Sequence, residues 1–281
     1  MASRNYDAIL LDLDGTLVDE SDRIHPRTLA ALRAAAEQGV RVMIATGRSE
    51  LATIPVVEQL GILNPAVVFN GAAMWCPSKR RLIEERVLSE RTLARLVRFG
   101  LERGLMTVAM CEGIKYATSP RNDAEWSALR DMTAVEYVDP ERMERLRAMR
   151  VTFFSDTHAR SDDVAAELES AVSQPMYITH FPLNCLPHHR DSKLLVCDVH
   201  PPCRGKAEAL RWLLDEHAIR PERVVAVGDA GNDVPMMTEA GLGCAMGNAY
   251  PEALAVADRV LGTCDSGTIG ELVEELFLGR S

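Results

Sequence analysis

Apolar and polar positions follow two different patterns along the chain, and the N-terminal part shows the first of them. Three apolar runs are too short for buried helices and predict buried strands: Ala8–Leu11, Val40–Ala45 and Ala66–Phe69. Apolar residues at helical spacing predict a helix from about Pro26 to a stop at Gly39, and a second helix over Glu50–Leu60. This alternation is typical of an α/β fold with a doubly wound, Rossmann-like parallel sheet.

The same alternation returns near the C-terminal end of the chain. A helix is predicted over Lys206–His217, and the apolar run Val224–Val227 follows it as a strand. A short helix over Val234–Glu239 and the short run Gly243–Met246 come next. We expect these elements to complete the sheet that the N-terminal part begins.

The middle of the chain has a different pattern. Two amphipathic helices, around Glu90–Glu102 and Asp162–Ala171, lie among short β-rich runs at Met106–Met110, Val151–Phe154 and Met176–Thr179. An α+β domain inserted into the sheet domain accounts for this change. We therefore expect a core domain formed by residues 1–81 and 200–281, with an inserted cap domain over residues 82–199.

Composition and charge limit the partners of the protein. The chain has 281 residues, 47% of them hydrophobic, and a formal net charge of −10, so a globular protein with a sizeable core is expected and nucleic acid is not an expected partner. The densest group of arginines alternates with glutamates at helical spacing, which predicts one solvated helix face and not a basic patch. Its members are Arg142, Arg145, Arg147 and Arg150.

Cysteine usage and the N-terminus favour a cytoplasmic protein. Seven cysteines is an odd number with no metal-ligand spacing, and Cys197 lies in the apolar run Leu194–Val199, so reduced thiols are expected. The segment Met1–Asp7 resembles neither a signal peptide nor a membrane span, and no run approaches about 18 apolar residues. We expect a soluble cytoplasmic protein with no membrane partner.

Polar residues follow three of the predicted strands. The sequences at these strand ends are Asp12-Leu13-Asp14-Gly15-Thr16, Thr46-Gly47-Arg48 and Gly228-Asp229-Ala230-Gly231-Asn232-Asp233. The carboxyl ends of parallel strands meet at one sheet edge, so four carboxylates gather there and repel one another unless a cation lies among them. Oxygen ligands select magnesium or calcium, and a phosphate-handling site favours magnesium. Taken alone, the first sequence could equally be an aspartate-rich turn.

Taken in order, these sequences resemble the four motifs of the haloacid dehalogenase superfamily. The series is Asp12-Leu13-Asp14-Gly15-Thr16-Leu17, Thr46-Gly47-Arg48, Lys206 and Gly228-Asp229-x-x-Asn232-Asp233. The insertion after the second motif, with Asn70-Gly71 before it and Met246-Gly247-Asn248-Ala249 near the end, resembles the Cof-type subfamily (type IIB), which has a large α+β cap of the C2 class. The resemblance implies a phosphatase.

The resemblance also implies catalytic roles. Asp12 would be the nucleophile, and Asp14 would be the acid/base that protonates the leaving oxygen and later activates water. Free aspartate has a pKa of about 3.9, so Asp12 needs no base at neutral pH, whereas Asp14 must hold a proton part of the time. Thr46 would donate its hydroxyl to a phosphoryl oxygen, and Lys206 would offset the negative charge.

A magnesium site is implied in the same way. Its ligands would be the Asp12 carboxylate, the Asp14 backbone carbonyl and Asp229, with Asp233 close by or acting through water. Arg204 lies two residues before Lys206 and competes with it, but only Lys206 opens the helix as the family lysine does.

Phosphate-binding residues are expected beside the metal. Asn232 would orient the phosphate or Lys206, and Gly47 and Arg48 would contact the phosphate. For Arg48 an ion pair that stabilises the core is an equal alternative.

Histidines of the cap offer a further candidate site. His188-His189-Arg190, with His180 and His200 nearby in the sequence, could form a zinc site or a clamp for substrate phosphate. Adjacent histidines in a strand point to opposite faces, so a polar cap loop is the favoured interpretation.

The sequence therefore predicts a magnesium-dependent phosphatase that acts on a small phosphorylated metabolite through an aspartyl-phosphate on Asp12. A phosphotransferase or phosphomutase using the same intermediate is an alternative. A regulatory module that is phosphorylated on Asp12 without turnover is another, although a resident acid/base at Asp14 argues against it.

Overall fold

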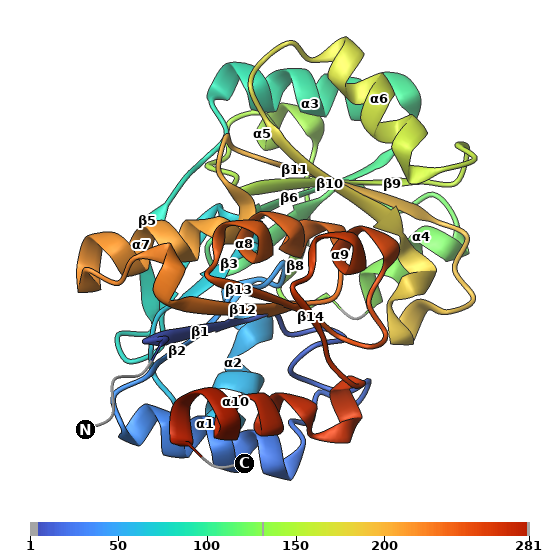
Figure 1. Ribbon diagram of the computed structural model, residues 1–281. Helices are drawn as coiled ribbons and strands as arrows, with labels where there is room; N and C mark the ends of the chain where they lie inside the picture. The colour runs from blue at the N-terminus through green and yellow to red at the C-terminus, as the bar shows by residue number, and fades with distance from the viewer. Residues whose placement is uncertain (1–4, 131, 280–281) are drawn as a thin grey trace. The chain divides into compact units, whose positions relative to one another are not determined.

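The computed structural model describes residues 5–130 and 132–279 (Figure 1). The chain forms two compact units: a core unit of Met1–Glu84 and Arg204–Ser281, and an inserted unit of Glu85–Cys203. The sequence placed the boundaries at 82 and 199, whereas strand β11 of the inserted unit continues to His200 before Pro201 and Pro202. The segment Met1–Asp7 is predicted to be neither a signal peptide nor a membrane span. Its first four residues lie outside the described residues.

A five-stranded parallel sheet forms the centre of the core unit. Its order is β14-β13-β12-β1-β2, and the strands are β1 (Ala8–Leu11), β2 (Arg41–Ile44), β12 (Val224–Gly228), β13 (Leu242–Ala245) and β14 (Arg259–Val260). Ala8 pairs with both Arg41 and Val224, so β1, β2 and β12 start in register, and β12 continues one residue further, to Gly228. The predicted α/β sheet is confirmed, and the carboxyl ends of β1, β2 and β12 lie at one edge.

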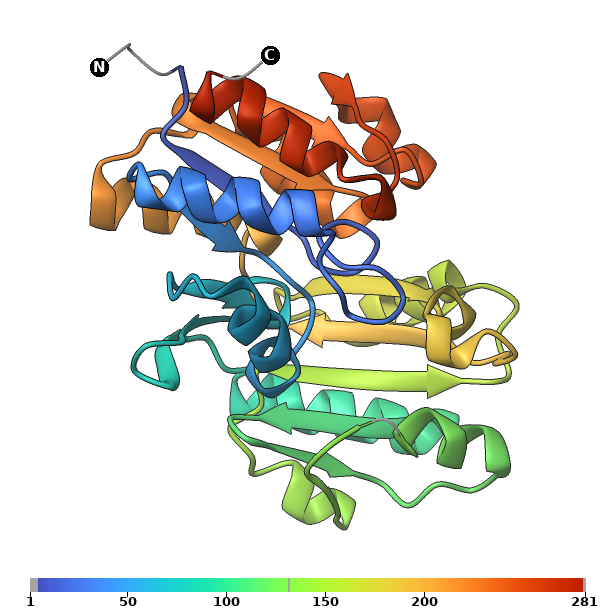
Figure 2. The same cartoon turned by 90° about the horizontal axis from the view of Figure 1, so that it is seen from below.

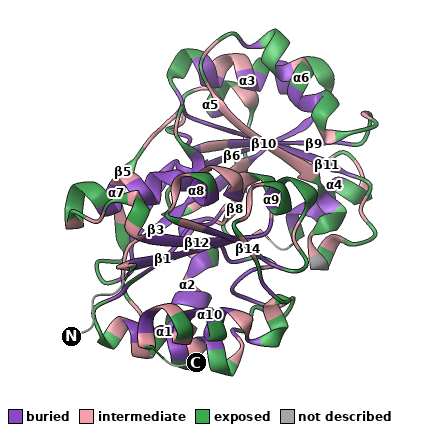
Figure 3. Cartoon of the chain, in the orientation of Figure 1, coloured by how far each residue is buried: buried purple, intermediate pink, exposed green. Residues whose placement is uncertain are grey.

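Helices cover both faces of this sheet. The helices α1 (Pro26–Glu37) and α10 (Thr268–Leu278) pack against each other on one face, as Figure 2 shows in blue and red. Residues of α7 (Glu208–His217), α8 (Val234–Glu239) and α9 (Pro251–Val256) pack with Leu10 and Met43 on the other. Burial on both faces explains why the central strands β1 and β12 are wholly apolar up to their polar ends (Figure 3).

The third predicted strand departs from the parallel sheet. Helix α2 (Glu50–Leu60) ends at Gly61, as predicted, and leads to β3 (Ala66–Val68). Beyond the end of β2, this strand forms an isolated parallel bridge between Ala45 and Val67, and it pairs antiparallel with β4 (Ala73–Cys76). With β5 (Arg81–Glu85) these strands form a separate three-stranded sheet.

The inserted unit has the predicted α+β architecture. Its six-stranded sheet has the order β10-β11-β9-β6-β7-β8 and is antiparallel except between β7 and β8. The strands are β6 (Met106–Cys111), β7 (Ile114–Ala117), β8 (Val135–Tyr137), β9 (Arg150–Ser155), β10 (Tyr177–Pro182) and β11 (Leu195–His200). The helices are α3 (Glu90–Arg103), α4 (Asp123–Arg130), α5 (Pro140–Met143) and α6 (Ser161–Ala171). Leu96 of α3 and Leu168 of α6 pack with Phe153 in the core of this unit.

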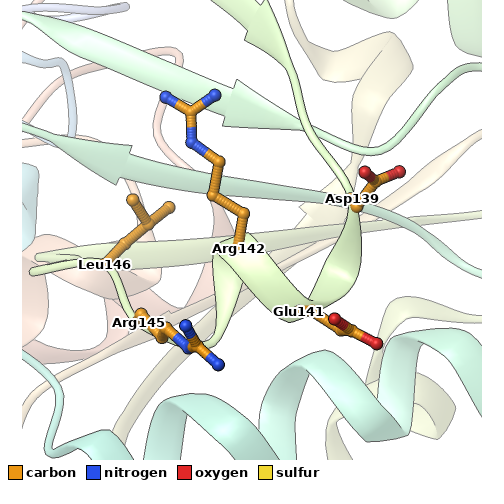
Figure 4. A pocket seen from close by; sticks show the side chains of 5 residues that line it. All are labelled: Asp139, Glu141, Arg142, Arg145 and Leu146. Atoms are coloured by element: carbon orange, nitrogen blue, oxygen red, sulfur yellow. The ribbon is translucent and has the colours of Figure 1, made fainter.

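The four arginines around α5 do not form one helix face, so that prediction is wrong. The helix ends at Met143. The chain then continues through the buried residues Ala148 and Met149 to the start of β9 at Arg150. Arg150 already lies in that strand, with its guanidinium 3.5 Å from the Asp198 carboxylate. Arg147 pairs with Glu85 at 2.7 Å. The other two arginines line a pocket with Asp139, Glu141 and Leu146: Arg142 and Arg145 (Figure 4).

The cysteines agree with the expectation of reduced thiols. All seven lie in the described part of the chain, and all are free; Cys76, Cys197 and Cys244 are buried. Across the described residues, every helix is too short or too polar to cross a lipid bilayer.

Candidate active site

Three neighbouring strands of the core sheet deliver the predicted residues to one edge. Asp12 follows β1 directly, and its backbone N–H donates to the Val227 carbonyl at 3.1 Å, which continues the parallel pairing by one residue. Asp229 follows β12 in the same way. Thr46 follows β2, and its N–H donates to the Val67 carbonyl at 2.9 Å. The order of the strands in the sheet therefore brings together residues that are far apart in the sequence.

The ammonium group of Lys206 lies between two of the carboxylates. Its Nζ is 2.6 Å from Asp12 Oδ1 and 2.6 Å from Asp233 Oδ1, and the residue is only 1% exposed. Burial alone would lower the pKa of Lys206, but the carboxylates of Asp12 and Asp233 raise it above its usual value, so the group stays charged. Arg204 instead pairs with Glu239 at 2.5 Å and is half exposed. The structure thus puts Lys206, and not Arg204, in the cluster.

Three aspartates form a group that could hold a cation. One oxygen each from Asp12, Asp229 and Asp233 lies within 4.8 Å of the others, and all three residues are buried. Burial, and then the charge of Asp233, raise the pKa of Asp12 well above its usual value and the pKa of Asp229 to about 7. A single ammonium does not balance three carboxylates, so this group attracts further positive charge. An all-oxygen donor set suits magnesium.

The two carboxylates after β12 have different surroundings. Asp233 Oδ2 accepts from the backbone N–H groups of Asp229 and Ala230, both at 3.0 Å, while its Oδ1 faces Lys206. Both oxygens of Asp233 are therefore engaged by the protein, which favours an indirect role toward a cation. Asp229 Oδ1 accepts from the Thr16 hydroxyl at 3.3 Å. Asp229 also contributes one oxygen to the group with Asp12 and Asp233 that could hold a cation.

The loop that carries Asp14 needs glycine at position 15. Gly15 has a φ of +75°, and a Cβ there would lie 2.5 Å from Asp229 Oδ2. Any larger residue would meet both a strained backbone and the carboxylate. Asn248 supports the same loop, since its Nδ2 donates to the Gly15 carbonyl at 3.0 Å.

Asp14 lies outside the carboxylate group, beside Arg48. The Arg48 guanidinium binds both Asp14 oxygens, with Nη2 to Oδ1 at 2.5 Å and Nε to Oδ2 at 3.0 Å. The same Nη2 lies 2.5 Å from Asp22 Oδ1. Burial would lower the pKa of Arg48, but hydrogen bonds with Asp14 and Asp22 raise it. The structure shows an ion pair of Arg48 with two partners, of which Asp14 is a predicted site residue, and the predicted contact of Arg48 with phosphate stays a prediction.

The Thr46-Gly47-Arg48 loop lies beside two asparagines. Thr46 is buried, and its hydroxyl oxygen accepts from the Arg48 N–H at 3.1 Å. Asn232 Nδ2 donates to Asn70 Oδ1 at 3.0 Å. Asn70, Asn248 and Asp22 had no predicted role. The first two had a recognisable signal, since each lies in an Asn-Gly or Gly-Asn pair shortly after an apolar strand.

The cap histidines do not form a metal site. His188 and His189 lie in a 3-10 turn (Pro187–His189) and not in a strand. His180 Nδ1 lies 3.1 Å from the Ser161 hydroxyl, and His200 is wholly buried at the end of β11, where burial and then Arg150 lower its pKa. Within residues 5–130 and 132–279, the aspartates of the core are the one group of three or more His, Cys, Asp or Glu residues arranged to hold an ion.

Comparisons with known proteins agree with this geometry. A family model described as haloacid dehalogenase-like hydrolase matches residues 9–273. Pyridoxal phosphate phosphatase YbhA of Escherichia coli (strain K12) is 28% identical, over 94% of this chain and 96% of its own. The 5-amino-6-(5-phospho-D-ribitylamino)uracil phosphatase YcsE of Bacillus subtilis (strain 168) is 27% identical, over 91% and 89%.

A solved structure shows the same fold. BT1666 from Bacteroides thetaiotaomicron, described among phosphatases of the haloalkanoate (HAD) enzyme superfamily, superimposes with a TM-score of 0.80 and 21% sequence identity. The match covers 98% of this chain and 96% of that chain. The parallel core and the inserted α+β unit are both part of this match.

Proposed function

Because this chain belongs to the haloacid dehalogenase-like hydrolases and is a phosphatase of that family, we propose that it hydrolyses small phosphomonoesters through an aspartyl-phosphate on Asp12 in a magnesium-dependent reaction. One observation carries the proposal. The buried Lys206 ammonium lies 2.6 Å from the Asp12 carboxylate, in a group of three aspartates with excess negative charge. Such an arrangement suits a nucleophile that must accept a phosphoryl group.

In the first step, an oxygen of Asp12 attacks the phosphorus atom, and the bond between phosphorus and the leaving oxygen breaks. Asp14 gives its proton to that oxygen, so the alcohol leaves neutral. In the second step, water attacks the phosphorus of the aspartyl-phosphate and loses a proton to Asp14, which regenerates Asp12 and releases inorganic phosphate. Lys206 offsets the charge of Asp12 and the phosphoryl group in both steps.

Asp14 must move between two partners in this scheme. Its carboxylate binds Arg48 through both oxygens and is half exposed, so it would have to leave this ion pair to reach the phosphoryl group. The Thr46 hydroxyl and the loop at Gly47 would bind phosphoryl oxygens, and Asn232 would orient them. Arg48 would hold Asp14 when that residue is not bonded to the substrate.

Magnesium fits the donors of the site. Asp12, Asp229 and the Asp14 carbonyl would bind it directly, and Asp233, whose oxygens are engaged by Lys206 and backbone N–H groups, would act through water. When bound, the ion offsets negative charge on the phosphoryl group and orients it. The excess of carboxylates over cations supports this assignment.

The substrate class is proposed from chemistry and from relatives. The two relatives above are named for phosphate esters of small metabolites, so we propose sugar phosphates or similar metabolites. The inserted unit would carry the specificity, with His188, His189 and Arg190 as first candidates. We also place the protein in the cytoplasm, a proposal supported by its seven free thiols.

A panel of phosphorylated metabolites, assayed for phosphate release with magnesium and with EDTA, tests the proposal. We expect turnover with magnesium, none with EDTA, and none in the Asp12→Asn variant, whose amide is a poor nucleophile and a weaker ligand. Release of phosphate with water as the sole acceptor would separate a phosphatase from a phosphotransferase. Full activity after thorough demetallation would contradict the proposal.

A further inference from the structure

A turn with an unusual backbone connects β3 to β4 in the core unit. Phe69, Asn70 and Gly71 have φ values of +51°, +49° and +93°, and all three residues are buried. Positive φ is unfavourable for residues other than glycine, and more so for a bulky side chain such as that of Phe69. Strain of this kind persists where surrounding contacts hold it, and it concentrates at functional sites.

Backbone hydrogen bonds fasten this turn to the Thr46-Gly47-Arg48 loop. The Phe69 N–H donates to the Arg48 carbonyl at 2.9 Å, and the Asn70 N–H donates to the Thr46 carbonyl at 3.0 Å. These two bonds hold the left-handed turn against the loop. Gly47, between the two acceptors, faces the Asn70 amide: a Cβ there would lie 3.1 Å from both Nδ2 and Oδ1.

The turn also touches the loops that carry Asn232 and Lys206. Asn70 Oδ1 accepts from Asn232 Nδ2 at 3.0 Å. Gly71 packs directly on the backbone of Gly205, which precedes Lys206, so any side chain at position 71 would collide with the Gly205 carbonyl. One turn therefore contacts three loops that come from separate parts of the chain.

We propose that Asn70 is a positioning residue that sets the spacing of Thr46 and Asn232 around the phosphoryl group, while the adjoining Gly71 holds the backbone that precedes Lys206. Asn70 acts through these groups and does not touch the reacting atoms. Asparagine suits the position for two reasons: it tolerates the left-handed backbone better than most residues, and its short amide reaches Asn232. The inference rests on the proposed function, since it assumes that these groups bind phosphate.

Two variants separate the backbone from the side chain. Asn70→Gly keeps the left-handed turn and removes the amide, whereas Asn70→Ala removes the amide and disfavours the turn. Asn64→Gly is the matched control, because Asn64 also uses its amide in a hydrogen bond, to the Val42 carbonyl at 2.9 Å, but lies before β3 and away from the site.

The assay uses p-nitrophenyl phosphate as substrate and inorganic phosphate as inhibitor, with magnesium varied. We expect kcat/KM to fall about 100-fold in Asn70→Gly and further in Asn70→Ala, since small displacements of binding groups have effects of this size. The inhibition constant of phosphate should rise in parallel. The magnesium concentration for half activation should stay within about twofold, because the carboxylates are not displaced. The melting temperature of Asn70→Gly should match that of Asn64→Gly.

The outcomes are distinguishable. An active wild-type enzyme with an Asn70→Gly variant of equal kcat/KM would overturn this inference alone. A loss of activity that follows a loss of magnesium affinity, or a loss equal to that of Asn64→Gly, would also overturn it. Wild-type protein without magnesium-dependent turnover on any phosphomonoester would overturn the proposed function, and this inference with it.

Discussion

Replacing Lys206 by methionine removes one charge from the centre of the site and little volume. The ammonium lies 2.6 Å from an oxygen of Asp12 and 2.6 Å from an oxygen of Asp233, and water does not reach it. Without it, both carboxylates stay buried with Asp229 nearby and no cation among them. The free energy of unfolding of this variant therefore measures what it costs to bury these carboxylates without a cation.

The expected loss in the free energy of unfolding follows from the burial of this ion pair. Removing one partner of a buried ion pair costs about 3–5 kcal/mol, because the remaining charge is left without compensation. The variant can relieve this cost by binding a proton on one of the carboxylates. A carboxyl whose pKa is raised in the folded state binds protons more tightly there than in the unfolded chain, so stability falls as the pH rises through that range. The loss should therefore be largest at alkaline pH.

Urea unfolding in the presence of EDTA measures the loss. We expect the free energy of unfolding of Lys206→Met to lie about 3–5 kcal/mol below wild type at about pH 8, and the difference to shrink at about pH 5.5. Lys79→Met, which changes an exposed lysine of the same unit, should stay within about 0.5 kcal/mol of wild type. A loss below about 1 kcal/mol at about pH 8, or a larger loss at the lower pH, would show that Lys206 does not compensate the buried carboxylates.

Two further predictions follow from the same geometry. Arg48→Lys should lower kcat about tenfold with little change in KM, because a single ammonium cannot hold both oxygens of Asp14 and also reach Asp22; unchanged steady-state kinetics would contradict this. Without metal, protein stability should fall as the pH rises from about 4 to about 7, since the folded pKa of Asp229 is raised from 3.8 to about 7. The fall should be on the order of 4 kcal/mol at most. Thermal unfolding with EDTA should show it, while magnesium or Asp229→Asn should suppress it, and an EDTA curve identical to that of Asp229→Asn would contradict the assignment.

Regular elements with local signals could be predicted from the sequence. Strand β1 ends where the apolar run meets Asp12, and α2 ends at Gly61, whose positive φ closes the helix. The meeting of Asp12, Thr46 and Asp229 at one edge also followed, because parallel strands present the same end to the same edge. These features depend on residues close together in the sequence or on topology alone.

Pairings between distant residues could not be predicted in this way. Charges at helical spacing placed Arg150 on a helix, but the buried residues before β9 and the partner Asp198 put it in a strand. Likewise, the residues next to Arg48 in the sequence do not indicate that it binds Asp14 and Asp22, since these ion pairs depend on which loops meet after folding. The left-handed backbone of Phe69 is also set by contacts with other loops, because phenylalanine itself disfavours it.

If Asp12 carries the phosphoryl group, the aspartyl-phosphate can be trapped and located on that residue. The Asp14→Asn variant should still form the aspartyl-phosphate from p-nitrophenyl phosphate, whose leaving group needs little protonation, but should hydrolyse it slowly. Acid quenching followed by borohydride reduction converts a phosphorylated aspartate to homoserine, which peptide mass spectrometry can locate. We expect homoserine at position 12 in the variant, formed only with magnesium. Release of nitrophenol with Asp12 unmodified, or with homoserine at another aspartate, would contradict it.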